Sequence, residues 1–154
     1  MDTSARGAWM GVLARADVSE MEAAWQELTS QGAPSTYDHL RAPERGLVMV
    51  RGRAGGDGAA FNLGEMSVTR CSVRLPDGTV GHGYVAGRST RHAELAALFD
   101  GLLQTADWSD RVAARVIAPT QAKLAAERLR TASKTAATRV EFFTMVREQG
   151  GPQE

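Results

Sequence analysis

Two runs of apolar residues at helical spacing open the chain and predict a helical hairpin. The first run comprises Trp9, Val12, Leu13 and Ala16, which recur on one face of a helix. The second run comprises Met21, Trp25 and Leu28. Ser19 and Glu22 form a capping-box pattern at the start of this second helix, and Gly32 marks its end.

The middle of the chain changes to the alternation of apolar and polar residues that is typical of β-strands. We expect strands at 47–50, 65–75 and 79–86. A glycine-rich run at 55–58 separates the first two, and Pro76-Asp77-Gly78 has the composition of a tight turn. Connections this short predict an antiparallel sheet.

Helical spacing returns after the third strand. Ser89 or Thr90 is suited to cap a helix there. The core face of this helix comprises Leu95, Leu98, Phe99 and Leu102. Another helix begins at Ser109, and residues 120–149, which contain neither glycine nor proline, predict a long terminal helix of about 28 residues.

The end of that terminal helix carries more apolar side chains than one stripe can bury. Phe142, Phe143 and Met145 occupy neighbouring faces close to the chain end, so we predict that they form an interface with a partner. The expected fold is α+β in one domain over residues 1–149, followed by a disordered tail at 150–154. It comprises an N-terminal helical hairpin, a small antiparallel sheet and C-terminal helices including one long terminal helix.

Charge and cysteine content narrow the function classes. Eighteen basic and eighteen acidic residues balance, so no overall charge favours nucleic acid or an anionic membrane. The start of the chain lacks the apolar run of a signal peptide, and no stretch approaches the length of a membrane span. The single cysteine excludes an intramolecular disulfide. We therefore expect a cytoplasmic protein that binds neither nucleic acid nor membrane.

Arginine is concentrated around the predicted sheet. Eight arginines lie between positions 41 and 91, against four acidic residues. Strand alternation places Arg70 and Arg74 on one face and Cys71 on the other, and Arg51 likewise shares a face with Arg53. A solvated or salt-bridged sheet face is the ordinary explanation, and binding of an anionic ligand or an acidic partner is the alternative. The candidate residues are Arg51, Arg53, Arg70, Arg74 and Arg88.

Other candidate motifs are incomplete. His92 and Glu94 resemble the His-x-Glu of zinc deaminases, but no Pro-Cys-x-x-Cys follows them, so we predict no metal site. The glycine-rich run lacks the lysine and the hydroxyl residue of a nucleotide-binding loop. Cys71 has no evident base beside it and is expected in the core. The residues therefore assign no catalytic group.

Several blocks recur in an order and spacing that are typical of one family. They are Arg51 and Arg53 with the following glycines, Phe61–Glu65, Val68–Cys71, Tyr84-Val85 with Gly87-Arg88, His92–Glu94, and Phe142–Arg147. Together they resemble the PhnG family, the G subunit of the bacterial carbon–phosphorus lyase. The resemblance covers nearly the whole chain.

The resemblance implies a subunit of a machine for phosphonate catabolism. Family members join the I, H and J subunits in a two-fold hetero-oligomer. The I subunit, with the G, H and L proteins, forms ribose 1-alkylphosphonate 5-triphosphate from ATP and an alkylphosphonate. The J subunit later breaks the carbon–phosphorus bond with S-adenosylmethionine and an iron–sulfur cluster. No cofactor is implied for this chain, and no activity is expected of it alone.

Three hypotheses follow, in order of preference. The first is an interaction subunit without catalytic residues. The second is a contributor of arginines to a site that binds the phosphates of the substrate or ATP. The third is an independent metal-dependent enzyme that uses His92 and Glu94.

Overall fold

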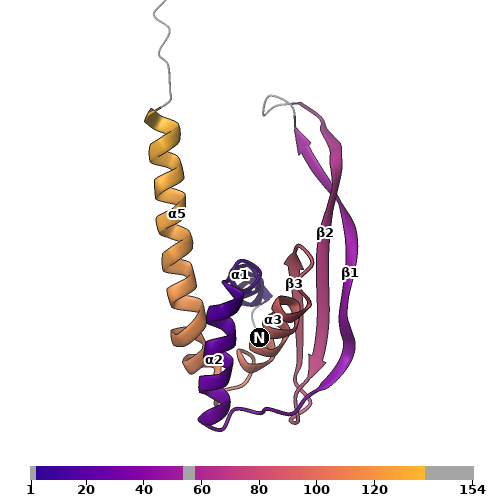
Figure 1. Ribbon diagram of the computed structural model, residues 1–154, viewed down its shortest axis with the longest axis vertical. Coiled ribbons are helices and arrows are strands. Elements are labelled where there is room, and N and C mark those ends of the chain that lie inside the picture. The colour runs from indigo at the N-terminus through magenta and orange to yellow at the C-terminus, as the bar shows by residue number, and fades with distance from the viewer. Residues whose placement is uncertain (1–2, 54–57, 138–154) are drawn as a thin grey trace, which may run out of the picture. The chain divides into compact units, whose positions relative to one another are not determined.

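The computed structural model describes residues 3–53 and 58–137 and confirms the α+β architecture (Figure 1). The elements are, in order, α1 (Thr3–Leu13), α2 (Val18–Ser30), β1 (Asp38–Arg53), β2 (Ala60–Arg74), β3 (Val80–Ala86), α3 (Thr90–Leu102), α4 (Ser109–Val112), the π-helical turn η1 (Ala113–Ile117) and α5 (Ala118–Ala137). The N-terminal helix pair, the antiparallel sheet and the C-terminal helices all lie in the predicted order.

The chain divides into two compact units, Met1–Lys123 and Leu124–Glu154. The first unit holds the sheet and every helix up to the first turns of α5. In the second unit, the described residues continue α5 as far as Ala137. The single domain over residues 1–149 stays a prediction. The predicted interface residues Phe142, Phe143 and Met145 and the predicted tail lie outside the described residues.

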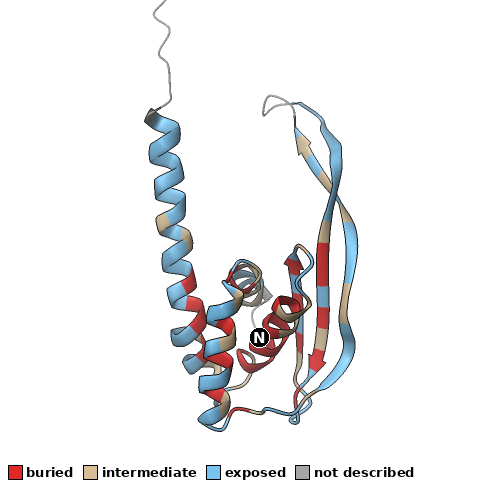
Figure 2. Cartoon of the chain, viewed as in Figure 1, coloured by how far each residue is buried: buried red, intermediate tan, exposed pale blue. Residues whose placement is uncertain are grey.

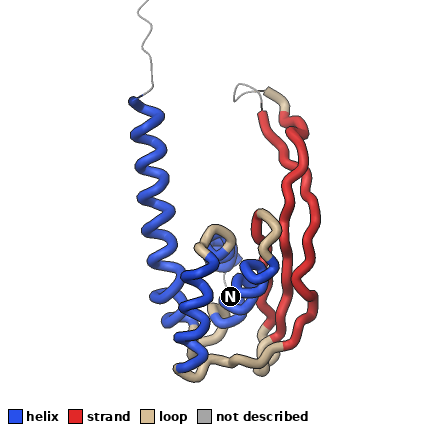
Figure 3. Tube along the Cα trace, in the orientation of Figure 1, coloured by secondary structure: helices blue, strands red, loops and turns tan. Residues whose placement is uncertain are grey.

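The three strands form one antiparallel sheet in the order β1-β2-β3 (Figure 3). The predicted turn between β2 and β3 is confirmed, because the Gly78 N–H donates to the Leu75 carbonyl at 2.9 Å. Gly78 has a φ of 88°, which favours glycine at this position. The Asp77 carboxylate completes the turn by accepting hydrogen bonds from the amide and the hydroxyl of Thr79.

The first strand is much longer than the sequence predicted. We expected 47–50, whereas β1 spans Asp38–Arg53. It lies at the edge of the sheet, where most of its side chains are exposed, so burial imposes no alternation on them. Its pairing with β2 also shifts register between His39 and Arg41 and again between Arg41 and Glu44, next to Pro43. Proline is tolerated at such edge and bulge positions but weakens any strand prediction.

The centre of the first unit is α3, which packs between the sheet and the other helices. It contacts β2 and β3 on one side and α1, α2 and α4 on the other. Figure 2 shows it buried along almost its whole length. The predicted face of leucines and Phe99 is buried, and so are Ala93 and Ala97 on the side toward the sheet. A helix that is apolar on all sides belongs to the interior of a layered fold.

Helix capping was predicted correctly at α3 but not at α2. The Ser89 hydroxyl accepts a hydrogen bond from the His92 amide and caps α3. At α2, the cap is Asp17, whose carboxylate accepts from the Ser19 and Glu20 amides. The capping box predicted at Ser19 is therefore wrong, because Ser19 already lies inside the first turn of the helix.

Candidate functional site

The sheet face that α3 leaves uncovered holds two of the predicted arginines. Arg70 and Arg74 are exposed, while Cys71 and Val73 are 1% and 0% exposed on the face against α3. The predicted segregation along β2 is therefore confirmed. The Cα atoms of the two arginines lie about 13 Å apart along the strand. They therefore line a surface and do not form a single anion-binding fork.

Arg70 is already engaged in an ion pair. Its Nε donates to Glu44 Oε1 at 2.5 Å, and Arg41 Nη1 donates to the same oxygen at 2.5 Å. Hydrogen bonds from Arg41 and then from Arg70 hold the pKa of Glu44 below its ordinary value. Arg74 forms no ion pair with any residue that the structure describes. Of the two, Arg74 is therefore the more available to an external anion.

The other three candidate arginines lie elsewhere. Arg51 and Arg53 are exposed and share one face of β1. The same face carries Arg45, whose cross-strand partner is the fully buried Thr69. Arg51 and Arg53 therefore lie on the sheet face opposite to the one that carries Arg70 and Arg74. Arg88 follows β3, and its carbonyl accepts a hydrogen bond from Arg45 Nε at 3.0 Å. The structure therefore does not gather the five arginines into one cleft.

The two polar residues of the His-x-Glu segment contact different partners. His92 is buried, and its Nε2 donates to the Leu13 carbonyl at 2.9 Å, which satisfies the last turn of α1. Glu94 accepts hydrogen bonds from Tyr37 Oη at 2.9 Å and from Arg91 Nη1 at 2.6 Å. Burial acts to raise the pKa of Glu94, but these hydrogen bonds outweigh it, and the pKa lies below its ordinary value.

The two side chains of the segment bond different parts of the fold. His92 donates its Nε2–H to the backbone of α1, whereas Glu94 bonds Tyr37 and Arg91. Across residues 3–53 and 58–137, no group of three or more histidine, cysteine, aspartate or glutamate side chains is placed to hold a metal ion.

Cys71 is a core residue, as predicted. Burial raises the pKa of its thiol to about 11, so the thiolate is not formed at neutral pH. The Cys71 S–H donates to the Arg41 carbonyl at 3.4 Å. On the other sheet face, Ser72 Oγ lies 2.9 Å from His82 Nδ1. No described carboxylate bonds the second ring nitrogen of His82, so this exposed pair lacks the third group that orients a nucleophile and its base.

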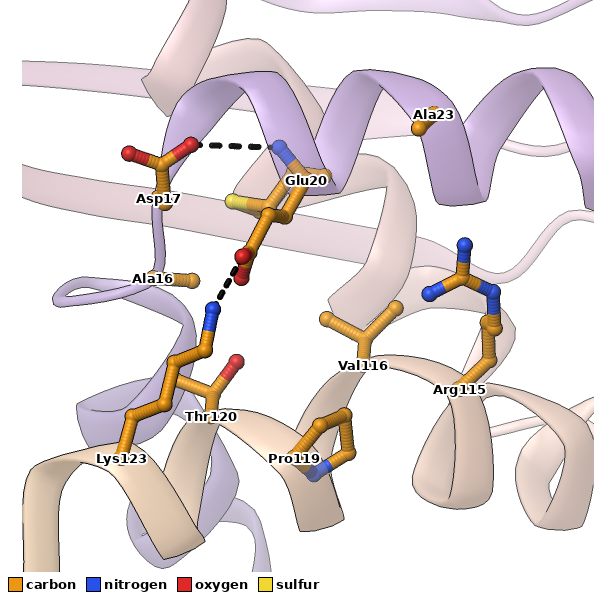
Figure 4. Close-up of a pocket in the computed structure, with 10 residues that line it drawn as sticks. Ala16, Asp17, Glu20, Ala23, Arg115, Val116, Pro119, Thr120 and Lys123 are labelled. Carbon is orange, nitrogen blue, oxygen red and sulfur yellow. Dashed lines mark hydrogen bonds and ion pairs between the residues drawn. The ribbon is translucent and has the colours of Figure 1, made fainter. Parts of the chain in front are cut away.

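A pocket of about 290 Å³ lies where α2 faces η1 and the start of α5 (Figure 4). Its charged groups are already occupied. Lys123 pairs with Glu20, Arg115 Nε donates to Glu27 Oε2 at 2.6 Å, and Asp17 caps α2. The pocket therefore offers no uncommitted charge to a ligand.

An ion-pair network around Arg91 was not predicted from the sequence. Its Nε donates to Glu22 Oε2 at 2.7 Å, which joins α2 to the start of α3, and it also pairs with Glu94. The spacing of Arg91 and Glu94, three residues apart on a helix, is a signal that could have been used. The Glu22 contact had no local signal, because the two residues are distant in sequence.

Comparison with known proteins identifies the family of this chain. Residues 4–148 match the protein family described as "Phosphonate metabolism protein PhnG". The chain belongs to the PhnG family. It is 48% identical over 138 residues to the alpha-D-ribose 1-methylphosphonate 5-triphosphate synthase subunit PhnG of Rhizobium meliloti (strain 1021), a match that covers 90% of this chain and 86% of that protein. The family resemblance drawn from the sequence is thus confirmed. No helix within the described residues is long and apolar enough to cross a membrane.

Proposed function

We propose that this chain is a subunit of an alpha-D-ribose 1-methylphosphonate 5-triphosphate synthase and acts in phosphonate catabolism by assembly, without catalysing alone. The observation that carries the proposal is the 48% identity to a synthase subunit over 90% of the chain. The chemistry of the described residues supports a noncatalytic role. The one thiol is protonated, the histidine of the His-x-Glu segment bonds the backbone, and the charges of the pocket are paired.

The partners in this proposal are the I, H and J subunits, in a two-fold hetero-oligomer. S-adenosylmethionine and the iron–sulfur cluster belong to the J subunit. The composition supports this division, because one buried cysteine cannot supply the several thiolates that hold a cluster.

A second candidate role is a contribution to phosphate binding. In the proposed reaction, a phosphonate oxygen attacks the anomeric carbon of ATP, and the bond to adenine breaks. The triphosphate and the phosphonate both carry negative charge that guanidinium groups can stabilise. The observation in favour is Arg74, which is exposed and forms no ion pair among the described residues.

The main proposal predicts that the synthase needs this chain although the chain alone is inactive. We expect adenine release from ATP and methylphosphonate by the I, H and L proteins to rise at least about tenfold when this chain is added, as expected when a subunit completes an assembly. Chromatography of adenine measures the rate, and the purified chain alone is the control. Full activity without the chain, or turnover by the chain alone, would contradict the proposal.

The arginines of the outer sheet face provide a second prediction. Because both side chains are exposed, Arg70→Ala and Arg74→Ala should leave the melting temperature of the isolated chain nearly unchanged. They should lower assembly with the partners or adenine release, and Arg74→Ala should do so more because that guanidinium has no described ion pair. Arg15→Ala is the matched control, because among the described residues the exposed Arg15 side chain bonds only the Gly11 carbonyl of the preceding helix α1. A strongly lowered melting temperature with normal assembly would assign both arginines to the fold.

A further inference from the structure

The hairpin of β1 and β2 continues beyond the third strand. β3 pairs only with the part of β2 from Val68 to Arg74. The hairpin beyond that point, residues 47–53 of β1 and 60–67 of β2, is here called the arm (Figure 1). Among the strands that the structure describes, β1 has no neighbour on its outer edge, and the arm part of β2 has none on the side of β3. Isolated two-stranded ribbons are only marginally stable in water, so the arm has little support of its own.

The arm is rich in exposed apolar side chains. Figure 2 shows it pale blue and tan, in contrast to the buried residues of β2 beside α3. Among the described residues, eight large hydrophobic side chains are exposed, and five of them belong to the arm. Those five are Leu47 (62%), Met49 (54%), Phe61 (47%), Leu63 (61%) and Met66 (42%). Such clustering on a short ribbon marks an interaction surface.

Three of these side chains share the face of the arm that is opposite to α3. Met66 pairs with Val48, and Phe61 pairs with Gly52. Val48 and Gly52 are four residues apart on β1 and lie on the same face, so their partners Met66 and Phe61 share that face too. Leu63 lies over Gly52, because a Cβ at Gly52 would be 2.5 Å from Leu63 Cδ1. The shift of register after Val50 turns Leu63 to this side. Because Gly52 has no side chain, Leu63 can pack over it and lie on the same face as Phe61 and Met66.

A small hollow lies at the base of the arm on the same side. Its volume is about 140 Å³, which suits one side chain of a partner. It is lined by Arg45, Gly46, Leu47, Val48, Val68, Arg70 and Tyr84. An apolar side chain with a neighbouring carboxylate matches this lining.

The charges of the arm decide which partner fits. The described arm residues include Arg51 and Arg53 but a single acid, Glu65, and Arg45 lies at the base of the arm. A second copy of the chain fits poorly, because antiparallel pairing of two β1 edges about Met49 would put Arg53 of one copy opposite Arg45 of the other. Like charges directly opposite each other destabilise a strand pair. A surface with carboxylates at its rim complements the arm.

We infer that the arm is a docking element that inserts into an apolar, carboxylate-rimmed groove on another subunit of the synthase. This inference rests on the proposed function, because it takes its partner from the same assembly. The apolar residues supply the buried contact, and Arg51 and Arg53 pair with the rim. Docking also supplies the packing that a two-stranded ribbon lacks.

A competition experiment tests this inference on the full chain. Wild-type and variant chains with different tags are co-expressed with the I, H and J subunits, and their ratio in the purified assembly is measured. The variants are Phe61→Ser with Leu63→Ser, and Arg51→Glu with Arg53→Glu. The matched control is Leu40→Ser, a β1 leucine that is 46% exposed but lies outside the arm. Circular dichroism of each isolated chain checks that the fold is intact.

We expect each double variant to be under-represented at least about tenfold, as for loss of central contacts in an interface. The control should stay within about twofold of the wild type. If both double variants are incorporated as well as the wild type, the arm is not a docking element, but the proposed function stands. If only Arg51→Glu with Arg53→Glu has no effect, the groove of the partner has no carboxylate rim that pairs with these arginines. Absence of the wild type from the assembly overturns both proposals. A dimer of the isolated chain that the arm variants dissociate would identify a second copy as the occupant.

Discussion

Gly83→Ala is expected to lower the free energy of unfolding by about 3 kcal/mol, because α3 leaves no room for a side chain on this part of β3. A Cβ at Gly83 would lie 2.0 Å from the Ala93 carbonyl oxygen and 2.9 Å from the Ala97 nitrogen. Gly81, two residues earlier on the same face, would meet the Ala97 carbonyl oxygen at 1.9 Å. These are backbone atoms of a buried helix, so neither strand nor helix can give way without separating the two layers.

The measurement is thermal and urea denaturation of the isolated chain. A loss of this size corresponds to a melting temperature about 6–12 °C lower for a protein of this length. Gly46→Ala is the matched control, since it is also a strand glycine but an added methyl group meets nothing within 4 Å. If the Gly83→Ala and Gly46→Ala variants have the same melting temperature, the close contact of α3 with β3 does not exist in solution.

Local patterns were sufficient for the elements that bury a face. The periodicity of α3 predicted its leucines, and the alternation of β2 placed Arg70 and Arg74 away from Cys71 before any pairing was known. Burial imposes these patterns, so they are visible in the sequence. The fit of α3 against the two glycines of β3 joins distant parts of the chain, and no local pattern predicts it.

The edge of the sheet was predicted least well. Most side chains of β1 are exposed, so the segment from Asp38 to Gly46 carried no apolar alternation. Without that strand, neither the ion pair of Arg70 with Glu44 nor the separation of Arg51 from Arg70 could be inferred, since both depend on the pairing register. The arm was not predicted because the expected second strand began at Glu65, whereas β2 begins at Ala60, although Phe61 and Leu63 were among the residues of the family resemblance.

The polar centre of the core is Asp100 of α3, whose side chain is fully buried. Its Oδ2 accepts hydrogen bonds from Arg6 Nη2 at 2.6 Å and from the His82 amide at 2.8 Å. Its Oδ1 accepts from Trp9 Nε1 at 2.8 Å. One carboxylate therefore connects α3 to α1 and to β3. No local pattern indicated this role, because Asp100 follows Phe99 on a helix whose other residues are mostly apolar.

Asp100→Ala is expected to lower the free energy of unfolding by about 3–5 kcal/mol, the range for removing one partner of a buried ion pair. The loss leaves the Arg6 guanidinium, the Trp9 indole N–H and the His82 amide without their shared acceptor. Asp100→Asn should cost less stability than Asp100→Ala, because the one remaining oxygen of the side chain still accepts hydrogen bonds. It should still cost some stability, because the new amide nitrogen faces donors. Urea denaturation measures both losses, and Glu27→Ala, which removes the exposed ion pair with Arg115, is the control expected to cost at most about 1 kcal/mol. An Asp100→Ala chain as stable as that control would mean that the three donors find other acceptors, and that the carboxylate does not hold α1 against α3 and the sheet.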